Sequence, residues 1–338
     1  MTVTNESLKA KVQKGWKPHN YLTNMCQAFF ADPADFVATK IFPICPVQQS
    51  ISRYYTFSKA DLARDNVQRK PSFGKVTPAI MGHTDDMYRC EVDQVIVGID
   101  EITALDYTRA GTPGAIDPRR AKTRFVAEQM LIHLDVEFAR KYFGTGIWTN
   151  EWTGVTAAPT GKQFYKFDDA NFDPVNFFDT LTKDIKQGAR RKPNKLVLGA
   201  EAYIGLKNNP ELLERVKYTG STANPANVTT NVIAQLFGLD AVEVLEGTYN
   251  AAGIGEEDMK FICDPKGALL CYTTSAPAID EPSAGYIFTW DMLGNGNYMA
   301  VDQWQGEGGT HSEFIEGIMS TDMKKTSEDL AVYLHDCV

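Results

Sequence analysis

The chain has 338 residues, a length that suggests about two domains, and its content of 43% hydrophobic and 23% charged residues excludes a largely disordered chain. Its net charge of −9 argues against a protein that follows a nucleic-acid backbone with its whole surface, because phosphate binding depends mainly on Lys and Arg. No apolar run approaches the ~20 residues that span a bilayer, and no apolar segment follows the lysines near the N-terminus, so we expect neither a membrane partner nor a secretory signal.

Residues 1–50 have the composition of an arm rather than of a domain. Their apolar pieces are short and are separated by Pro33, Pro43 and Pro46. Proline fixes its own φ and favours extended geometry in the residue before it, so residues 41–47 are predicted to be extended. An arm has no core of its own, and its apolar side chains need a covering surface on the same subunit or on a neighbour. The candidate contact residues are Phe29, Phe30 and Phe36.

Two β-rich stretches flank a long polar segment. Residues 51–57 (ISRYYTF) and 90–99 (CEVDQVIVGI) are rich in aromatic and branched side chains and predict a long hairpin. The segment between them is too long for a structureless loop inside a compact domain, so we predict an extended loop, residues 51–103, that reaches off the body. Its cationic side chains are candidates for contact with an acidic neighbour: Arg64, Arg69, Lys70 and Lys75.

The strongest helix signal covers residues 117–143. Asp117 is a good N-cap residue, Pro118 suits the first helical position, and Gly144 predicts the end of the helix. Apolar side chains recur at helical spacing, which predicts a helix of roughly 39 Å at 1.5 Å per residue. Cations crowd its first turns, where they oppose the helix dipole, and this suggests carboxylates or phosphate as a partner. These cations are Arg119, Arg120, Lys122 and Arg124.

The remaining elements are shorter. Asp173-Pro174 repeats the same start signal and predicts a second helix that ends near Gly188. From residue 194 onward, short strands alternate with short helices. This alternation indicates an α+β fold with mixed sheet pairing.

No reactive motif emerges from the sequence. His133 has Glu137 four residues on, but no H-E-x-x-H is present, so we favour a structural or solvated role for this pair. There is no G-x-S-x-G elbow and no glycine-rich phosphate loop. The six cysteines are scattered without a C-x-x-C pair and are interpreted as buried free thiols. We therefore predict no catalytic residue, no bound metal and no cofactor.

The order of these parts resembles the major capsid proteins of tailed bacteriophages, in particular the lambda E-type branch of the Hong Kong 97-type fold. The most specific local likeness lies in residues 193–203 (PNKLVLGAEAY) and 206–215 (LKNNPELLER). Together they resemble the family's P-N-x-L-V-L-G … L-x-x-N/H-P segment. The likeness extends over nearly the whole chain as an order of parts.

The resemblance implies an α+β fold of the Hong Kong 97 type with five parts. These are an N-terminal arm (residues 1–50), an extended loop (51–103), a peripheral domain (104–193) that contains the spine helix (117–143), an axial domain (194–311), and return strands (312–338) that complete the peripheral domain. It implies a protein without enzymatic activity that self-assembles into the hexamers and pentamers of an icosahedral phage head around double-stranded DNA. The loop would lie over a neighbouring subunit, and the arm would wrap another.

The expected partners are further copies of the chain, a separate scaffolding protein, a portal and a decoration protein. The protein would contact DNA through non-specific electrostatic interactions. It would be synthesised in the bacterial cytoplasm and found in the capsid shell of the virion. Two alternatives stay open. One is a hydrolase-like α+β enzyme with a mobile loop, and the other is a different phage structural protein, such as a decoration or tail subunit.

Overall fold

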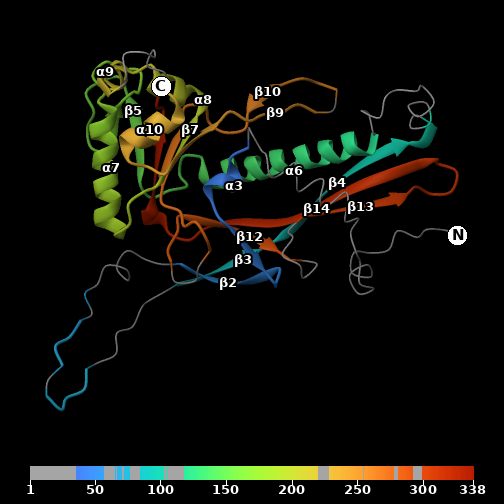
Figure 1. Ribbon diagram of the computed structural model, residues 1–338, viewed down its shortest axis with the longest axis horizontal. Coiled ribbons are helices and arrows are strands. Elements are labelled where there is room, and N and C mark those ends of the chain that lie inside the picture. The colour runs from blue at the N-terminus through green and yellow to red at the C-terminus, as the bar shows by residue number, and fades with distance from the viewer. Residues whose placement is uncertain are drawn as a thin grey trace.

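The computed structural model describes residues 36–56, 65, 67–70, 72–76, 84–102, 105, 118–219, 228–253, 255–277, 281–291 and 299–338. They form an elongated body with a long helix beside one sheet, a second sheet with several helices at one end, and a loop that projects from one edge (Figure 1). Among these residues, none of the helices combines the length and the apolar character that a membrane span requires.

The first sheet has five strands and is centred on β14 (Ser312–Lys325). β13 (Met299–Gln305) lies on one side of β14 and β4 (Glu91–Asp100) on the other, both antiparallel to it. The last residues of β14 pair with β12 (Gly285–Trp290), which in turn pairs in parallel with β1 (Ile44–Val47). β14 therefore joins segments from both halves of the chain into one sheet.

Helix α6 (Pro118–Tyr142) packs along this sheet (Figure 1). The two elements approach closely at Gly317 of β14, where a side chain would collide with Val126 and Met130. The predicted long helix is confirmed, while its expected N-cap residue, Asp117, lies outside the described residues. Its buried side chains recur every three to four residues, as a one-sided helix requires. They include Val126, Ala127, Met130, Leu134, Phe138 and Tyr142.

The prediction that residues 51–57 form a hairpin with residues 90–99 is wrong. β2 (Ile51–Thr56) pairs with β3 (Thr84–Arg89) and not with residues 90–99. Those residues belong to β4, which pairs with β14 along its whole length. In β4, Val95 and Val97 pack against the core beneath α6. Pairing with β14 places these alternate side chains in that core, which a strand in the projecting loop could not reach.

The second sheet has six strands in the order β6-β5-β15-β11-β7-β8. Its strands β7 (Lys195–Gly199) and β11 (Ala268–Cys271) are almost entirely buried, as expected for strands covered on both faces. In β7, Leu196 and Leu198 belong to the helix-covered core, whereas Val197 points to the opposite face and joins the core around α6. The other elements of this unit are β5 (Glu151–Val155), β6 (Gln163–Tyr165), β8 (Ala241–Leu245), β15 (Ala331–His335), α7 (Pro174–Ala189), α8 (Ala200–Lys207), α9 (Pro210–Thr219), α10 (Thr230–Phe237) and the 3-10 turn η1 (Glu328–Leu330).

Helix α7 begins where the sequence predicts. The Asp173 carboxylate accepts hydrogen bonds from the backbone N–H groups of Val175 (3.1 Å) and Asn176 (3.2 Å). The helix ends at Ala189, next to the predicted stop, because Arg190 adopts a left-handed φ of 58°. The two Asp-Pro pairs from which helices were predicted, at 117–118 and 173–174, therefore each precede a helix.

Neither sheet matches the boundaries expected at residues 193/194 and 311/312. α7 precedes the first boundary, yet its buried side chains share the core of the six-stranded sheet. β12 lies between the two boundaries and pairs with β14 in the five-stranded sheet, while β15 follows the second boundary and pairs with β11 and β5. The chain thus crosses repeatedly between the sheets, and an assignment by sequence order cannot reproduce this.

Candidate assembly surfaces

The arm enters the described structure at Phe36, which is half-buried. The Asp135 carboxylate on α6 then accepts hydrogen bonds from the backbone N–H groups of Val37 (3.3 Å) and Ala38 (2.9 Å). Asp135 is 1% exposed. Burial raises its pKa to about 6, although these hydrogen bonds and the nearby Lys40 act to lower it. A buried carboxylate thus holds the start of the short helix α3 (Ala38–Ile41).

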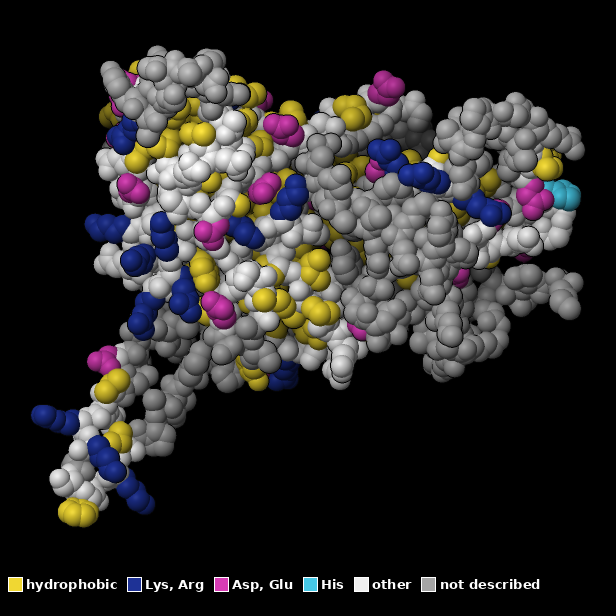
Figure 2. All heavy atoms as spheres, in the orientation of Figure 1, with side chains coloured by type: hydrophobic (Ala, Val, Ile, Leu, Met, Phe, Trp, Pro, Cys, Tyr) yellow, Lys and Arg dark blue, Asp and Glu magenta, His cyan; other side chains and the backbone are white. Residues whose placement is uncertain are grey.

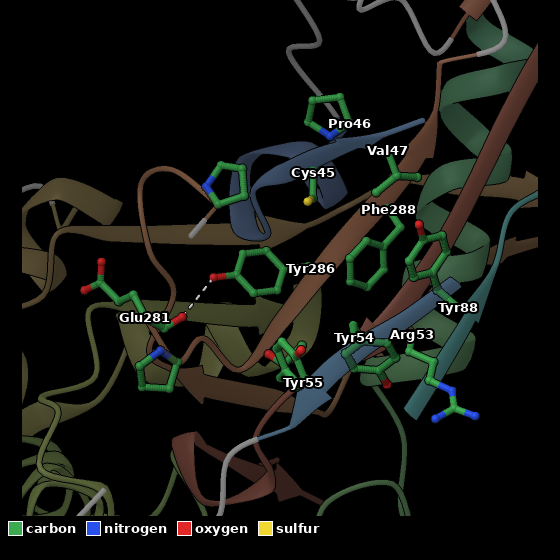
Figure 3. Close-up of a pocket in the computed structure, with 13 residues that line it drawn as sticks. Cys45, Pro46, Val47, Arg53, Tyr54, Tyr55, Tyr88, Glu281, Tyr286 and Phe288 are labelled. Carbon is green, nitrogen blue, oxygen red and sulfur yellow. Dashed lines mark hydrogen bonds between the residues drawn. The ribbon is translucent and has the colours of Figure 1, made fainter. Parts of the chain in front are cut away.

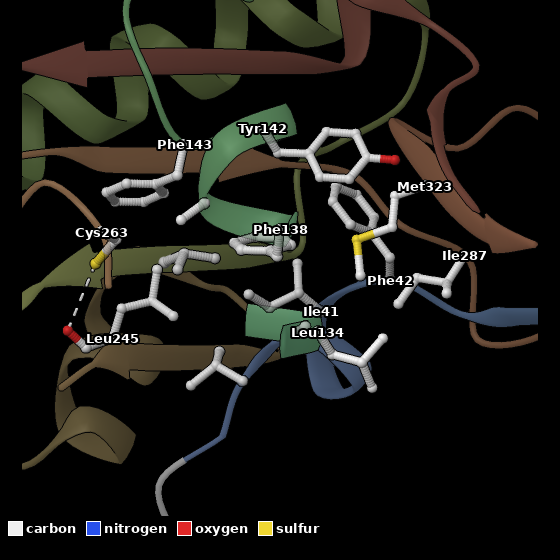
Figure 4. Packing of buried hydrophobic residues seen from close by; sticks show 14 of the residues in the cluster. Ile41, Phe42, Leu134, Phe138, Tyr142, Phe143, Leu245, Cys263, Ile287 and Met323 are labelled. Carbon is white, nitrogen blue, oxygen red and sulfur yellow. Dashed lines mark hydrogen bonds between the residues drawn. The ribbon is translucent and has the colours of Figure 1, made fainter. Parts of the chain in front are cut away.

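The other end of α3 is held by a cation. The Lys195 ammonium donates hydrogen bonds to the carbonyl oxygens of Lys40 and Ile41, both at 2.7 Å. Burial lowers the pKa of Lys195. The next residue, Phe42, is fully buried, and its ring lies 4.6 Å from that of Tyr142 (Figure 4). The anion at the N-terminus and the cation at the C-terminus both complement the backbone groups of α3, so this part of the arm is fixed to its own subunit.

The base of the loop is also fixed to the body. The Tyr54 hydroxyl lies 2.8 Å from the Asp86 carboxylate and 3.1 Å from the carbonyl oxygen of Lys325. The ring of Tyr88 stacks on that of Phe288, with centroids 4.7 Å apart. These contacts set the direction in which β2 and β3 leave the five-stranded sheet.

The tip of the loop, residues 67–76, stands away from the body and combines apolar and basic side chains (Figures 1 and 2). Phe73 is fully exposed and has a left-handed φ of 60°, and Val67 is 89% exposed. A fully exposed aromatic side chain with basic neighbours is typical of a surface that another molecule covers. The basic side chains described there are Arg69, Lys70 and Lys75, all exposed.

A groove of about 450 Å³ lies at the base of the loop (Figure 3). Its wall is mainly apolar and rich in aromatic residues and prolines, and its polar side chains include Arg53 and Glu281. The Tyr286 hydroxyl donates a hydrogen bond to the carbonyl oxygen of Glu281 at 3.1 Å. The aromatic residues of the wall are Tyr54, Tyr55, Tyr88, Tyr286 and Phe288. This composition suits the burial of apolar side chains better than acid–base chemistry.

The first turns of α6 carry the second predicted basic cluster. Arg119 forms an ion pair with Glu313 at 3.0 Å, and Arg124 forms one with Glu128 at 2.9 Å. These pairs satisfy part of the cluster within the subunit. The other exposed side chains of these turns include Arg120, Lys122 and Phe125.

The predicted contact residues that the structure describes lie at three separate places and do not converge on one site. Phe29, Phe30 and Arg64 lie outside the described residues, and Phe36 is half-buried near α6. The remaining predicted residues are exposed on the loop tip or on α6. They are Arg69, Lys70, Lys75, Arg119, Arg120 and Arg124.

His133 and Glu137, the pair considered in the sequence as possible metal ligands, do not form a metal site with each other. His133 lies 3.3 Å from Asp93, while Glu137 pairs with Arg140 and Lys141. In the part of the chain that the structure describes, no group of three His, Cys, Asp or Glu side chains is placed to hold a metal ion. These side chains form a network of surface ion pairs.

The cysteines behave as buried thiols. All five described cysteines are free, and four of them are buried, as predicted. Burial raises the pKa of Cys90, Cys263 and Cys271 to about 12. Because the thiolate is the reactive form, these groups are inert at neutral pH.

Three features of these surfaces were missed from the sequence. Phe73 on the loop tip was the easiest to find, because it is the one Phe, Tyr or Trp residue between Phe57 and Tyr88. Asp135 interrupts the apolar face of the long helix beside Leu134, which is a signal for a buried polar partner. The aromatic groove gave no local signal, since its walls come from distant segments.

The sequence is similar to that of a curated phage protein over part of its length. No protein-family model matches the chain. The major capsid protein of Burkholderia phage BcepMu is 33% identical over 84 residues. The match spans 25% of this chain and 26% of that protein, about a quarter of each.

The fold is similar to those of several solved structures over most of the chain. A phage-related protein from Bordetella bronchiseptica RB50 has a TM-score of 0.72 and 18% identity, with 95% of this chain and 97% of that chain covered. The virus-like particle protein from Pyrococcus furiosus has a TM-score of 0.53 and 9% identity, with 94% and 98% covered. The capsid structure of Cyanophage P-SCSP1u gives a TM-score of 0.50 and 10% identity, with 86% and 85% covered. The chain therefore has the mixed helix-and-strand, Hong Kong 97-type fold seen in phage capsid structures, and about a quarter of its sequence is similar to a phage major capsid protein.

Proposed function

We propose that this chain is the major capsid protein of a tailed bacteriophage. Its copies self-assemble into the hexamers and pentamers of an icosahedral head that encloses double-stranded DNA. The observation that carries this proposal is the loop tip, where Phe73 and Val67 are exposed and no described surface covers them. The shared fold and the partial sequence match to a curated major capsid protein support it.

The energetics of the loop tip favour assembly through many weak contacts. Full burial of a phenylalanine side chain contributes on the order of 1.5–3 kcal/mol, which alone cannot hold two subunits together. In a closed shell every subunit makes such contacts with several neighbours, and the contacts act together. Charged side chains around Phe73 would set the register of the contact more than its strength.

The two sheets provide the two domains of this proposed subunit. The five-stranded sheet with α6 as its spine helix forms the peripheral domain, and the six-stranded sheet with α7 to α10 forms the axial domain. The loop after β2 lies over a neighbouring subunit, and the arm that precedes Phe36 wraps another. This division follows the strand pairing rather than the order of residues.

The proposed partners follow from the same function. They are further copies of the chain, a separate scaffolding protein, a portal and a decoration protein, all within the virion after synthesis in the host cytoplasm. Packaged DNA would meet local basic groups without sequence recognition, because the chain as a whole is acidic. Arg120 and Lys122 are candidates, since Arg119 and Arg124 already pair with carboxylates.

Assembly of the purified chain tests the proposal. We expect closed shells of uniform diameter by electron microscopy and light scattering, with or without a co-expressed scaffold. A variant in which a short Gly-Ser linker replaces residues 65–76 should remain folded by circular dichroism and fail to form shells. Monodisperse monomers of the wild-type chain under every condition, with scaffold included, would contradict the proposed function.

A hydrolase-like enzyme remains the second candidate, but the described geometry favours assembly. Such an enzyme needs a pocket in which acids with perturbed pKa values converge. Asp135 is the carboxyl group whose pKa is raised among the described residues, and its oxygens are occupied by the backbone of the arm. The groove beside β2 is aromatic, and Glu281 there faces Arg191 and the Tyr272 hydroxyl.

A further inference from the structure

A separate two-stranded ribbon projects from the six-stranded unit. Strands β9 (Thr248–Asn250) and β10 (Met259–Phe261) pair with each other and with no other described strand. The Asn250 side chain holds the turn between them. It accepts hydrogen bonds from the N–H groups of Ala252 (3.1 Å) and Asp258 (2.9 Å) and donates one to the carbonyl oxygen of Glu256 (2.8 Å). The ribbon is thus an ordered projection, although two strands alone are marginally stable in water.

The surface of this ribbon is acidic and apolar. Glu256, Glu257 and Asp258 are all exposed, and Lys260 offsets one of these charges through an ion pair with Asp258 at 2.6 Å. Met259 in β10 is 65% exposed, and Phe261 is 41% exposed. Exposed large apolar side chains beside unpaired acids indicate a surface for a basic, apolar partner.

The loop tip has the complementary composition. Arg69, Lys70 and Lys75 are exposed and flank the fully exposed Phe73 in sequence. The ribbon and the loop also leave the body from opposite long edges (Figure 1). When copies of a chain join head to tail, one edge of each copy meets the opposite edge of the next, and the contacts close into a ring. The loop tip of one copy is therefore brought to the side on which the next copy carries its ribbon.

We propose that the β9–β10 ribbon is the docking site for the loop tip of an adjacent copy. Phe73 packs against Met259 and Phe261, and the three cations of the tip face the acids of the ribbon. This inference rests on the proposed function and adds the receiving surface of the loop. Two other surfaces fit less well: the aromatic groove lies at the base of the loop on the same edge, and the first turns of α6 are basic, so they would repel the tip.

Charge reversal tests the pairing directly. The ribbon variant Glu256→Lys/Glu257→Lys and the tip variant Lys70→Glu/Lys75→Glu should each lower the yield of shells at least about tenfold, because each places like charges together. Combining the two variants should restore the yield to within about threefold of wild type, since opposite charges then meet again. Circular dichroism and thermal melting of the unassembled chains check that every variant is folded.

The matched control combines the ribbon variant with Arg120→Glu/Lys122→Glu on α6. This combination should not restore assembly, because the α6 cluster is not the partner of the ribbon. Rescue by the α6 variant, wild-type yield from the ribbon variant alone, or no rescue by the tip variant would each overturn the inference. The linker replacement of residues 65–76 tests the proposed function independently, so a failure of the ribbon inference is distinguishable from a failure of that function.

A cross-linking experiment does not depend on charge. In shells of the Ser72→Cys/Met259→Cys variant, which keeps Phe73, treatment with diamide should join copies by a disulfide, as the two thiols lose two electrons and two protons to diamide. Reducing agent should reverse the ladder of multimers seen on a non-reducing gel. The two single variants control for the native cysteines. Shells that form but yield no more multimers than the single variants would overturn the inference.

Discussion

The anchor between Asp135 and the arm makes a prediction that can be worked out in detail. Asp135 is buried, and its pKa in the folded chain is about 6, against an ordinary value of 3.8. The folded state therefore binds this proton more tightly than the unfolded state does. The group consequently makes the fold most stable below about pH 4, and that stability is lost as the pH rises through about 6. At about 1.36 kcal/mol for each pH unit between the two values, the loss amounts to about 3 kcal/mol.

The perturbation is Asp135→Asn, which removes the titrating group and keeps an oxygen that can accept from the Ala38 N–H. The introduced NH₂ group is left without an acceptor, which costs about 1–3 kcal/mol at any pH. Relative to wild type, the variant should be less stable by about 1–3 kcal/mol near pH 4, and between equal and about 2 kcal/mol more stable near pH 7. The difference in unfolding free energy should change by about 3 kcal/mol across that range.

Urea denaturation of the unassembled chain at several pH values, followed by tryptophan fluorescence, measures this difference. Because the variant and the wild type share every other titrating group, those contributions cancel in the comparison. Asp135→Ala serves as a second variant: it leaves the N–H groups of Val37 and Ala38 unpaired and should expose the arm to chymotrypsin at Phe42. A stability difference between wild type and the Asn variant that does not vary with pH would refute the reasoning.

Three further predictions concern packing, a buried amide and the loop tip. Gly317→Ala should destabilise the fold by about 1–3 kcal/mol in thermal melts, because the new methyl group meets Val126 and Met130, whereas Gly308→Ala, with open space around it, should have little effect. At the start of α9, the Asn209 side chain accepts a hydrogen bond from the Leu212 N–H and also donates one to the carbonyl oxygen of Phe167. Asn209→Ala should therefore lower the unfolding free energy by about 1–3 kcal/mol for each buried group left unpaired. A loss below ~0.5 kcal/mol would contradict this role. Phe73→Ser should leave the melting temperature of the monomer unchanged and reduce the yield of shells, and a normal yield would show that this ring is not at a contact.

Local signals in the sequence predicted local structure well. The Asp-Pro pairs and the apolar spacing placed α6 and α7 because N-caps and helical periodicity act within a few residues. The extended arm was predicted from its prolines. It holds for β1, whereas the residues just before β1 form the short helix α3. That helix depends on Asp135 and Lys195, which lie far away in sequence, so nothing within the arm could reveal it.

Long-range pairing was beyond the sequence patterns. A strand such as β4 alternates in the same way whether it pairs with β2 or with β14, so the alternation cannot choose its partner. β10 was among the short strands predicted after residue 194, but its partner β9 has only three residues, too few to show a period, so the ribbon was not recognised. The basic residues of the loop were predicted as contacts, and the acidic residues that we propose as their counterparts became apparent only from the three-dimensional arrangement.

The position of β14 and β15 has a consequence for when the subunit can fold. These two strands come last in the chain, yet each pairs on both of its sides, one within each sheet. A nascent chain that has not yet produced residues 312–335 lacks a shared strand in both sheets and cannot complete either core. Folding is therefore deferred until synthesis has passed these strands, and incomplete chains on the ribosome cannot present a finished surface to one another. The topology thus separates translation from subunit association in time.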